Sequence, residues 1–158
     1  LEHRRQRQMC IRDSYNNAKF SMTQYDCHKI NSKGELIAQH IVNNWYTAYL
    51  LSKAKDFRFY AILEPSLFTT GADYSYFNPK GRKNLSSIKK QHELVYPLVI
   101  KQIKQTCELD SEFCKHIFDG RKWISPEAQV YFDSFHINKE GNMIIVKRLL
   151  ENISKLNK

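Results

Sequence analysis

The chain has 158 residues, of which 42% are apolar and 13% aromatic, and a formal net charge of +9. This composition excludes an intrinsically disordered chain, and the length suffices for one domain with its own core. No apolar run approaches the roughly 18 residues that cross a bilayer, so we expect no membrane span. The lysines are scattered rather than gathered in a tract, so we interpret the charge as a solvated surface and expect no nucleic-acid partner.

Residues 1–14 show neither a helical nor a strand period, and we interpret them as non-native. The run Gln8–Asp13 resembles the translation of a transposase adaptor that is used to prepare sequencing libraries; the alternative is a short basic arm. Such a segment is excluded from reasoning about the fold. We therefore treat residues 15–158, with a net charge of +7, as the C-terminal part of a single domain. The sequence does not indicate a compartment.

The first regular elements are predicted after a loop over residues 15–33. A helix is expected from Gly34 to about Lys53, with Asn31 or Ser32 as its cap. A buried strand is expected over Phe57–Leu63, and Glu64-Pro65 ends it because proline cannot donate to a central ladder. A helix that feeds a short apolar strand is typical of α/β folds, so we expect a central strand in a parallel sheet. The apolar stripe of the helix comprises Ile37, Ile41, Trp45, Ala48 and Leu51.

The segment over residues 66–85 is predicted to be a long loop at the end of this strand, where α/β folds place their sites. Its aromatic residues could stack on a sugar or a base, and in an enzyme they would border the substrate cleft. The alternative is a disordered lid. Glu64 could be an acid in the cleft, but we favour a strand-end cap. The loop candidates are Tyr74, Tyr76 and Phe77, beside Lys80, Arg82 and Lys83.

Two further helices and a strand are predicted in the second half of the chain. A helix over Ser86–Glu108 has an apolar face, and Pro97 predicts a kink or a helix start within it. A short strand is expected near Cys114–Phe118, and a final helix over Lys139–Leu156. The inner face of the first helix comprises Ile88, Val95, Val99 and Ile103, and that of the last comprises Ile144, Ile145, Arg148, Leu149 and Ile153.

The cysteines and most histidines carry no recognisable site. The four cysteines form no C-x-x-C motif and fit no zinc spacing. Cys107 and Cys114 could pair in an oxidising compartment, but we expect a chance pair of buried thiols. Four histidines are far apart in sequence, and we expect each to be at the surface or partly buried. The cysteines outside this pair are Cys10 and Cys27, and the four histidines are His28, His40, His92 and His116.

The most informative residues are Asp133 and His136, which form a D-x-x-H motif before a glycine and a new helix. In serine hydrolysis an imidazole takes the serine proton, and a carboxylate holds the imidazole in the right tautomer and stabilises its cation. A separation of three residues lets the carboxylate reach one ring nitrogen while the other faces a cleft. D-x-x-H alone also occurs by chance, with surface ion pairing as the usual explanation.

The surroundings of this motif resemble the C-terminal block of SGNH/GDSL hydrolases. The block reads Asp133-x-x-His136-x-Asn138-x-x-Gly141-Asn142, followed by an apolar helix. The resemblance extends over about residues 34–156. It is specific in this final block and looser in the rest of that range. It includes the strand that ends in Ile62-Leu63-Glu64-Pro65-Ser66-Leu67-Phe68, the helix with Tyr96-Pro97, and Ile117-Phe118-Asp119-Gly120.

The family's early blocks are absent from the chain. Neither the G-D-S motif that holds the nucleophile nor the G-x-N-D motif of the oxyanion hole occurs. Asp13-Ser14 lies in the adaptor-like segment without a buried strand before it, and Asn16-Asn17 lacks the glycine. This order indicates a truncated gene, and we expect the chain to be inactive alone because it lacks the nucleophile.

The resemblance implies a partial flavodoxin-like parallel sheet with flanking helices, whose N-terminal strands are missing. It also implies hydrolysis of a carboxylic ester, including O-acetyl groups, on a lipid, a sugar or a small molecule. His136 would be the general base and Asp133 the acid that orients it, with no metal or organic cofactor. The alternatives are a non-catalytic basic α/β module that binds RNA, a polyanion or a glycan, and a catalytically dead homologue that binds a glycan.

Overall fold

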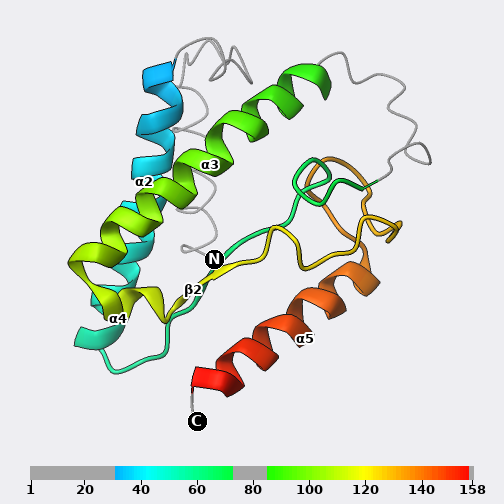
Figure 1. Cartoon of the computed structure of the whole chain (residues 1–158). Helices are drawn as coiled ribbons and strands as arrows, with labels where there is room; N and C mark the ends of the chain where they lie inside the picture. Colours follow the sequence, from blue (N-terminus) through cyan, green and yellow to red (C-terminus); the bar gives the residue numbers. More distant parts are fainter. Residues whose placement is uncertain (1–30, 73–84, 157–158) are drawn as a thin grey trace, which may run out of the picture.

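The computed structural model describes residues 31–72 and 85–156, which form a mixed α/β arrangement (Figure 1). The adaptor-like segment, residues 15–30 of the early loop and the candidate residues Tyr74, Tyr76 and Phe77 lie outside the described residues. Residues 31–33, predicted to be loop and helix cap, instead form the start of the first described helix. The elements are, in chain order, α2 (Asn31–Ala54), β1 (Ala61–Leu63), α3 (Leu85–Leu109), α4 (Ser111–Cys114), β2 (Ile117–Asp119) and α5 (Lys139–Leu156).

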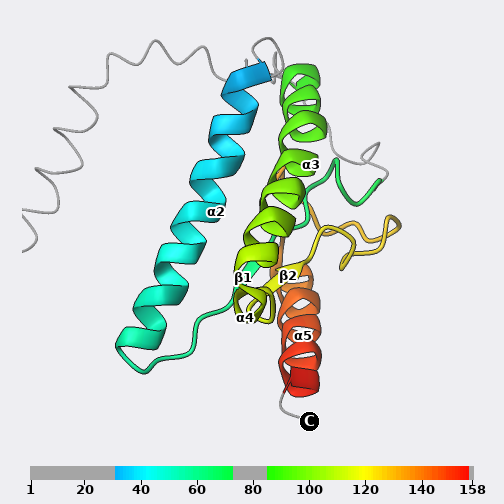
Figure 2. The ribbon, with the colours of Figure 1, turned by 60° about the vertical axis from the view of Figure 1, so that its left-hand side comes forward.

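The two long helices α2 and α3 lie side by side, as Figure 2 shows. The predicted stripe of α2 is off by one position: Leu51 is 52% exposed, whereas Ala38, Val42 and Tyr49 are buried. The buried face is shifted because α3 comes close to α2 near Gly34. A Cβ on Gly34 would lie 3.2 Å from the side chain of Leu94. A helix face with small residues at its contact lets the neighbouring helix come close, and the larger residues flank that contact.

The sheet comprises two parallel strands in the described part of the chain. Ala61 pairs with Ile117, and Leu63 with Asp119, so the predicted parallel orientation is confirmed. The predicted length is wrong, since β1 begins at Ala61 and Phe57 is 50% exposed. Among the described residues β1 pairs on one side only, which is the sheet edge expected of a central strand whose other neighbours are missing from the chain. The carboxyl ends of both strands nevertheless lie at the same edge, where α/β folds place their sites.

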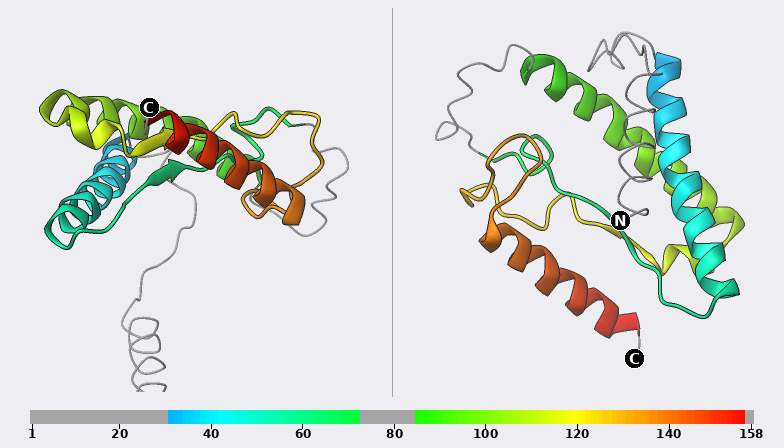
Figure 3. Two further views of the ribbon diagram at one scale, coloured as in Figure 1. Left: turned by 90° about the horizontal axis from the view of Figure 1, so that it is seen from below. Right: turned by 180° about the vertical axis from the view of Figure 1, so that it is seen from behind.

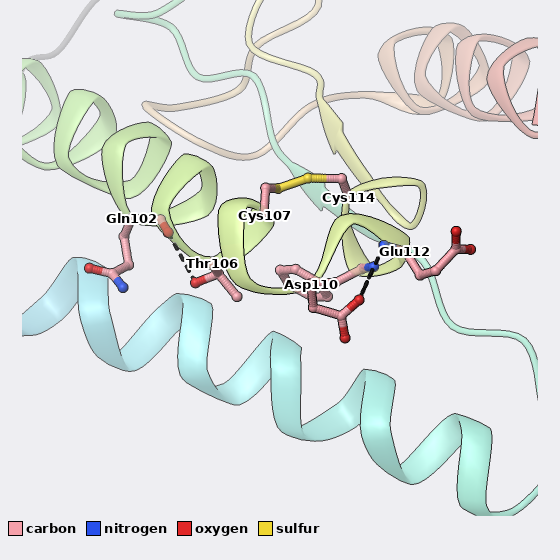
Figure 4. Close-up of a disulfide and its surroundings, with 7 residues drawn as sticks. Gln102, Thr106, Cys107, Asp110, Glu112 and Cys114 are labelled. Carbon is pink, nitrogen blue, oxygen red and sulfur yellow. Dashed lines mark hydrogen bonds between the residues drawn. A yellow bond between two sulfur atoms is a disulfide. The ribbon is translucent and has the colours of Figure 1, made fainter.

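The α3–α4 corner differs from the predictions in two ways. α3 runs through Pro97 without a new start, so the predicted helix start there is wrong. The short helix α4, capped by the side chain of Asp110, brings Cys114 back over the last turns of α3. Cys107 and Cys114 form a disulfide with their Cα atoms 5.5 Å apart, which corrects the expectation of unpaired thiols (Figure 4).

The last helix, α5, has the predicted bounds. It lies on the other side of the two strands from α2 and α3 (Figure 3). The Asn138 side chain caps it by accepting a hydrogen bond of 2.9 Å from the Gly141 N–H. Arg148 is exposed, so its predicted place on the inner face is wrong. A second apolar cluster lies beneath this helix and comprises Leu67, Ala72, Ile124, Val130 and Tyr131, with Ile137, Ile144 and Ile145 against it. No described helix has the length and apolar character needed to span a bilayer.

Candidate active site

The loop that carries Asp133 and His136 is closed by backbone hydrogen bonds at its base. Tyr131 and Ile137 form an antiparallel bridge. The Phe132 N–H donates to the His136 carbonyl at 2.8 Å, and the Asn138 N–H donates to the Val130 carbonyl at 2.8 Å. A tight loop of this kind brings residues three apart in sequence together without help from distant elements.

Within the loop, the carboxylate of Asp133 binds the imidazole of His136. The Nδ1–H of His136 donates to Oδ2 of Asp133 at 2.7 Å. Oδ1 accepts from the backbone N–H groups of Phe135, at 2.8 Å, and His136, at 2.9 Å. The carboxylate therefore accepts three hydrogen bonds, and this arrangement fixes both the ring and its tautomer.

The same contacts determine the charge of Asp133. Partial burial by itself would raise its pKa. The hydrogen bonds from the His136 backbone, the His136 ring and the Phe135 backbone outweigh that effect and lower the pKa to about 2. Asp133 is therefore ionised at neutral pH, in the form that orients an imidazole and stabilises its cation.

His136 faces a cavity of about 260 Å³ at the carboxyl end of β1. Its side chain is 78% exposed, whereas that of Asp133 is 21% exposed. The cavity is lined by Glu64, Pro65, Phe135, His136, Ile137, Asn142 and Ile145. Glu64 follows β1 directly, as predicted for a residue at the strand end. It is exposed and lies at the rim of this cavity. With Nδ1 engaged by Asp133, Nε2 is the ring nitrogen left to exchange a proton with a bound molecule.

The described residues supply this imidazole with no serine partner. Ser134 lies between the two residues of the motif, but its side chain is buried, with 1% exposed, and it has no hydrogen-bond partner within the described chain. Its carbonyl accepts from the Leu67 N–H at 3.2 Å. This contact joins the loop to the turn after β1. Within residues 31–72 and 85–156, the site therefore has an oriented base without a serine in reach.

A buried serine and histidine that the sequence analysis missed lie beside this loop. Ser66 Oγ and His92 Nδ1 are 3.1 Å apart, and both residues are buried. His92 was expected at the surface or partly buried, so that expectation is wrong. Burial lowers the pKa of His92 to about 4, which keeps the ring neutral at pH 7. The only signal in the sequence is that His92 falls on the apolar face of α3, one turn from Ile88 and Val95.

The other candidates among the described residues do not join the site, and His28 lies outside those residues. His40 is exposed on α2, and His116 is partly buried, where its Nδ1–H donates to the Phe59 carbonyl at 2.8 Å. In residues 31–72 and 85–156, no group of three or more His, Cys, Asp or Glu side chains could hold a metal ion. A larger groove of about 640 Å³ lies on the outer face of α5, away from this loop. It is lined by Met143, Val146, Lys147, Leu150, Glu151, Ser154 and Lys155.

Comparisons with known proteins place the chain in no family. No protein-family model matches it, and searches of curated proteins and of solved structures gave no match. The geometry of the site is therefore the evidence from which its function is inferred.

Proposed function

We propose that Asp133 and His136 are the acid and the base of a serine-type hydrolase that cleaves carboxylic esters, including O-acetyl esters. The observation that carries this proposal is the 2.7 Å hydrogen bond from His136 Nδ1 to Asp133, on an imidazole that faces a cavity. The parallel strand pair between helices agrees with a partial flavodoxin-like sheet of the SGNH type. The nucleophilic serine would come from sequence outside these 158 residues.

In this mechanism His136 first accepts the proton of the attacking serine through Nε2. The serine oxygen adds to the ester carbonyl, and the carbon–oxygen bond to the alcohol breaks as Nε2 returns the proton to the leaving alkoxide. Water then attacks the acyl-enzyme and gives a proton to Nε2. The bond between the serine oxygen and the acyl carbon breaks as Nε2 returns this proton to the serine, and the carboxylic acid is released. Asp133 stays ionised throughout, and it holds the productive tautomer and stabilises the imidazolium formed in each step.

The chain by itself should lack this activity. We expect no hydrolysis of an unactivated alkyl ester such as ethyl butyrate above the solvent rate with the 158-residue protein, because a lone imidazole attacks activated aryl esters but cannot displace an alkoxide without a serine to form the acyl-enzyme. A rate that disappears in His136→Ala would show that this chain contains another nucleophile, and the proposed division of the site would be wrong.

The direct test uses the protein expressed from the complete reading frame of the gene. His136→Ala should lower kcat by several orders of magnitude, and Asp133→Asn by about 10⁴-fold, because an amide can stabilise the wrong tautomer. KM should change little, since these groups act mostly in the transition state. His40→Ala, at an exposed position on α2, is the matched control and should keep wild-type turnover. A folded His136→Ala protein with near-normal kcat would overturn the proposal.

A further inference from the structure

The loop that carries Asp133 and His136 is attached at two adjacent points, one on the turn after β1 and one on α3. The first is the hydrogen bond from the Leu67 N–H to the Ser134 carbonyl. The second is a ring contact, because the ring centroids of Phe135 and His92 lie 4.8 Å apart. Phe135 precedes His136 directly, so its side chain packs against α3 while its backbone N–H binds Asp133.

His92 is itself held from several sides. Its Nδ1 lies 3.1 Å from Ser66 Oγ. Its ring stacks on Tyr96 with centroids 5.0 Å apart and meets the edge of Phe68 at 5.4 Å. An imidazole with its rotation restrained by a hydrogen bond and two rings is a rigid support for Phe135.

Such a support matters because the contacts within the loop fix the His136 ring relative to Asp133 but do not orient the loop relative to β1. The hydrogen bonds between Asp133, Phe135 and His136 determine the local geometry of the pair, but they move with the loop as a unit. His136 is largely exposed, so its own packing adds little restraint. The direction of the ring relative to β1 therefore depends on what the neighbouring residues touch.

We propose that Ser66 and His92 are positioning residues, which hold Phe135 and thereby fix the Asp133–His136 pair over the cavity at the end of β1. Neither residue touches a reacting atom. A neutral His92 suits this role, since a charged ring would have to be desolvated between aromatic neighbours. The consequence for turnover rests on the proposed function, but the positioning itself is a property of this chain.

The experiment follows the loop by NMR in the 158-residue protein, without any substrate. The readouts are contacts of the loop with its surroundings: NOE signals between the His136 ring and Pro65, which line the same cavity, and the amide proton of Leu67, which its hydrogen bond to the Ser134 carbonyl protects from exchange. In His92→Ala we expect the His136 signals to weaken or vanish and the Leu67 amide to exchange at least tenfold faster. Amides in the α2–α3 core, such as that of Val99, should keep their protection.

Two milder variants guard against a general loss of folding. His92→Phe keeps a ring against Phe135 and should restore most of the protection that His92→Ala removes. Ser66→Ala frees the imidazole and should give an intermediate loss. His116→Ala is the matched control, because this ring also stacks on aromatic neighbours, Tyr49 and Tyr60, but lies away from the loop, and it should leave the His136 signal unchanged.

The outcomes separate this proposal from the esterase proposal. Loss of the His136 signal in His92→Ala, with recovery in His92→Phe, supports the positioning role even if the complete protein hydrolyses no ester. Unchanged His136 NOE signals and an unchanged exchange rate of the Leu67 amide in folded His92→Ala overturn it even if the complete protein is an esterase. A loss of protection as large in His116→Ala would also overturn it, because the effect would then be general.

Discussion

The surroundings of the two residues keep Asp133 ionised and His92 neutral at pH 7. Hydrogen bonds lower the pKa of Asp133 to about 2, against an ordinary value of 3.8, and burial lowers that of His92 to about 4, against 6.5. Both shifts make the folded state bind protons less readily than the unfolded chain. Each therefore contributes an increase of stability with pH, but over a different range.

These ranges give a prediction about acid stability. As pH falls from 6.5 to about 4, the unfolded chain gains a proton at His92 and the folded chain does not, so the free energy of unfolding should decrease. His92→Phe should flatten this part of the curve. Asp133→Asn should change only the part below about pH 4, where its stabilisation is lost as pH falls to about 2. Urea unfolding at a series of pH values measures both, and an unaltered slope between pH 6.5 and 4 in His92→Phe would contradict the burial argument.

The role of Asp133 could be predicted from the sequence, whereas that of His92 could not, and the difference has a physical reason. Asp133 and His136 are three positions apart in one tight loop, so their contact depends on local geometry that spacing can reveal. Ser66 and His92 are 26 positions apart, and their contact depends on how α3 packs against the turn after β1. No local pattern encodes that packing, and the intervening loop has no period from which to derive it.

The first turn of α5 packs closely against the loop of the candidate site. A Cβ on Gly141 would lie 2.9 Å from the Cβ of Ile137 and 3.1 Å from the Cβ of Val130. Both atoms sit next to the backbone and cannot rotate away. The glycine in the motif after His136 is thus explained by close packing between helix and loop, and Asn138 by its capping hydrogen bond.

Replacement of this glycine should push α5 away from the loop. Gly141→Ala should destabilise the protein by about 1–3 kcal/mol through overpacking, although alanine favours the helix by up to about 1 kcal/mol. Gly34→Ala is the matched control in α2, because its close neighbours are the flexible ends of Leu94 and Leu98. We expect this control to stay within about 1 kcal/mol of wild type. Chemical denaturation measures both, and equal stabilities of the two variants would contradict the packing argument.

The disulfide between Cys107 and Cys114 closes a short loop between α3 and α4. The chain-entropy argument gives about 2–3 kcal/mol of stabilisation for a loop of this length. Dithiothreitol should therefore lower the melting temperature of the wild-type protein, and Cys107→Ser should lower it similarly. The reductant should have no further effect on Cys107→Ser. A melting temperature that is the same with and without reductant would show that this bond does not stabilise the fold.

At the level of elements, the sequence predicts periodic segments better than contacts between them. The bounds of α5 agree with the prediction, because its apolar period is clear. α4 was missed because four residues are too few to show a period, and its start depends on the Asp110 side chain. The buried face of α2 includes Ser52, whose hydroxyl donates to the Tyr49 carbonyl. A serine does not count as apolar, so the apolar pattern predicted the buried face one position away, at Leu51.

On the scale of the whole molecule, the described part of the chain has two apolar clusters with the strand pair next to them. One cluster lies between α2, α3 and α4 and contains Val42, Val99 and Phe113. The other lies under α5 and supports the loop of Asp133 and His136. The outer face of α5 leaves Met143, Val146 and Leu150 exposed in the large groove along this helix. At this scale, the site is the place where the strand end, the turn after it and the start of α5 converge.

The central claim is that His136 activates a serine, and a fluorophosphonate tests it without knowledge of the substrate. An activated serine oxygen attacks the phosphorus and displaces fluoride, and the covalent adduct is detected by intact-mass spectrometry. The account predicts rapid labelling of one serine in the protein from the complete reading frame, slower labelling by several orders of magnitude in His136→Ala, and none in the 158-residue chain. Equal labelling rates in wild type and folded His136→Ala, or no labelling of the complete wild-type protein, would contradict it.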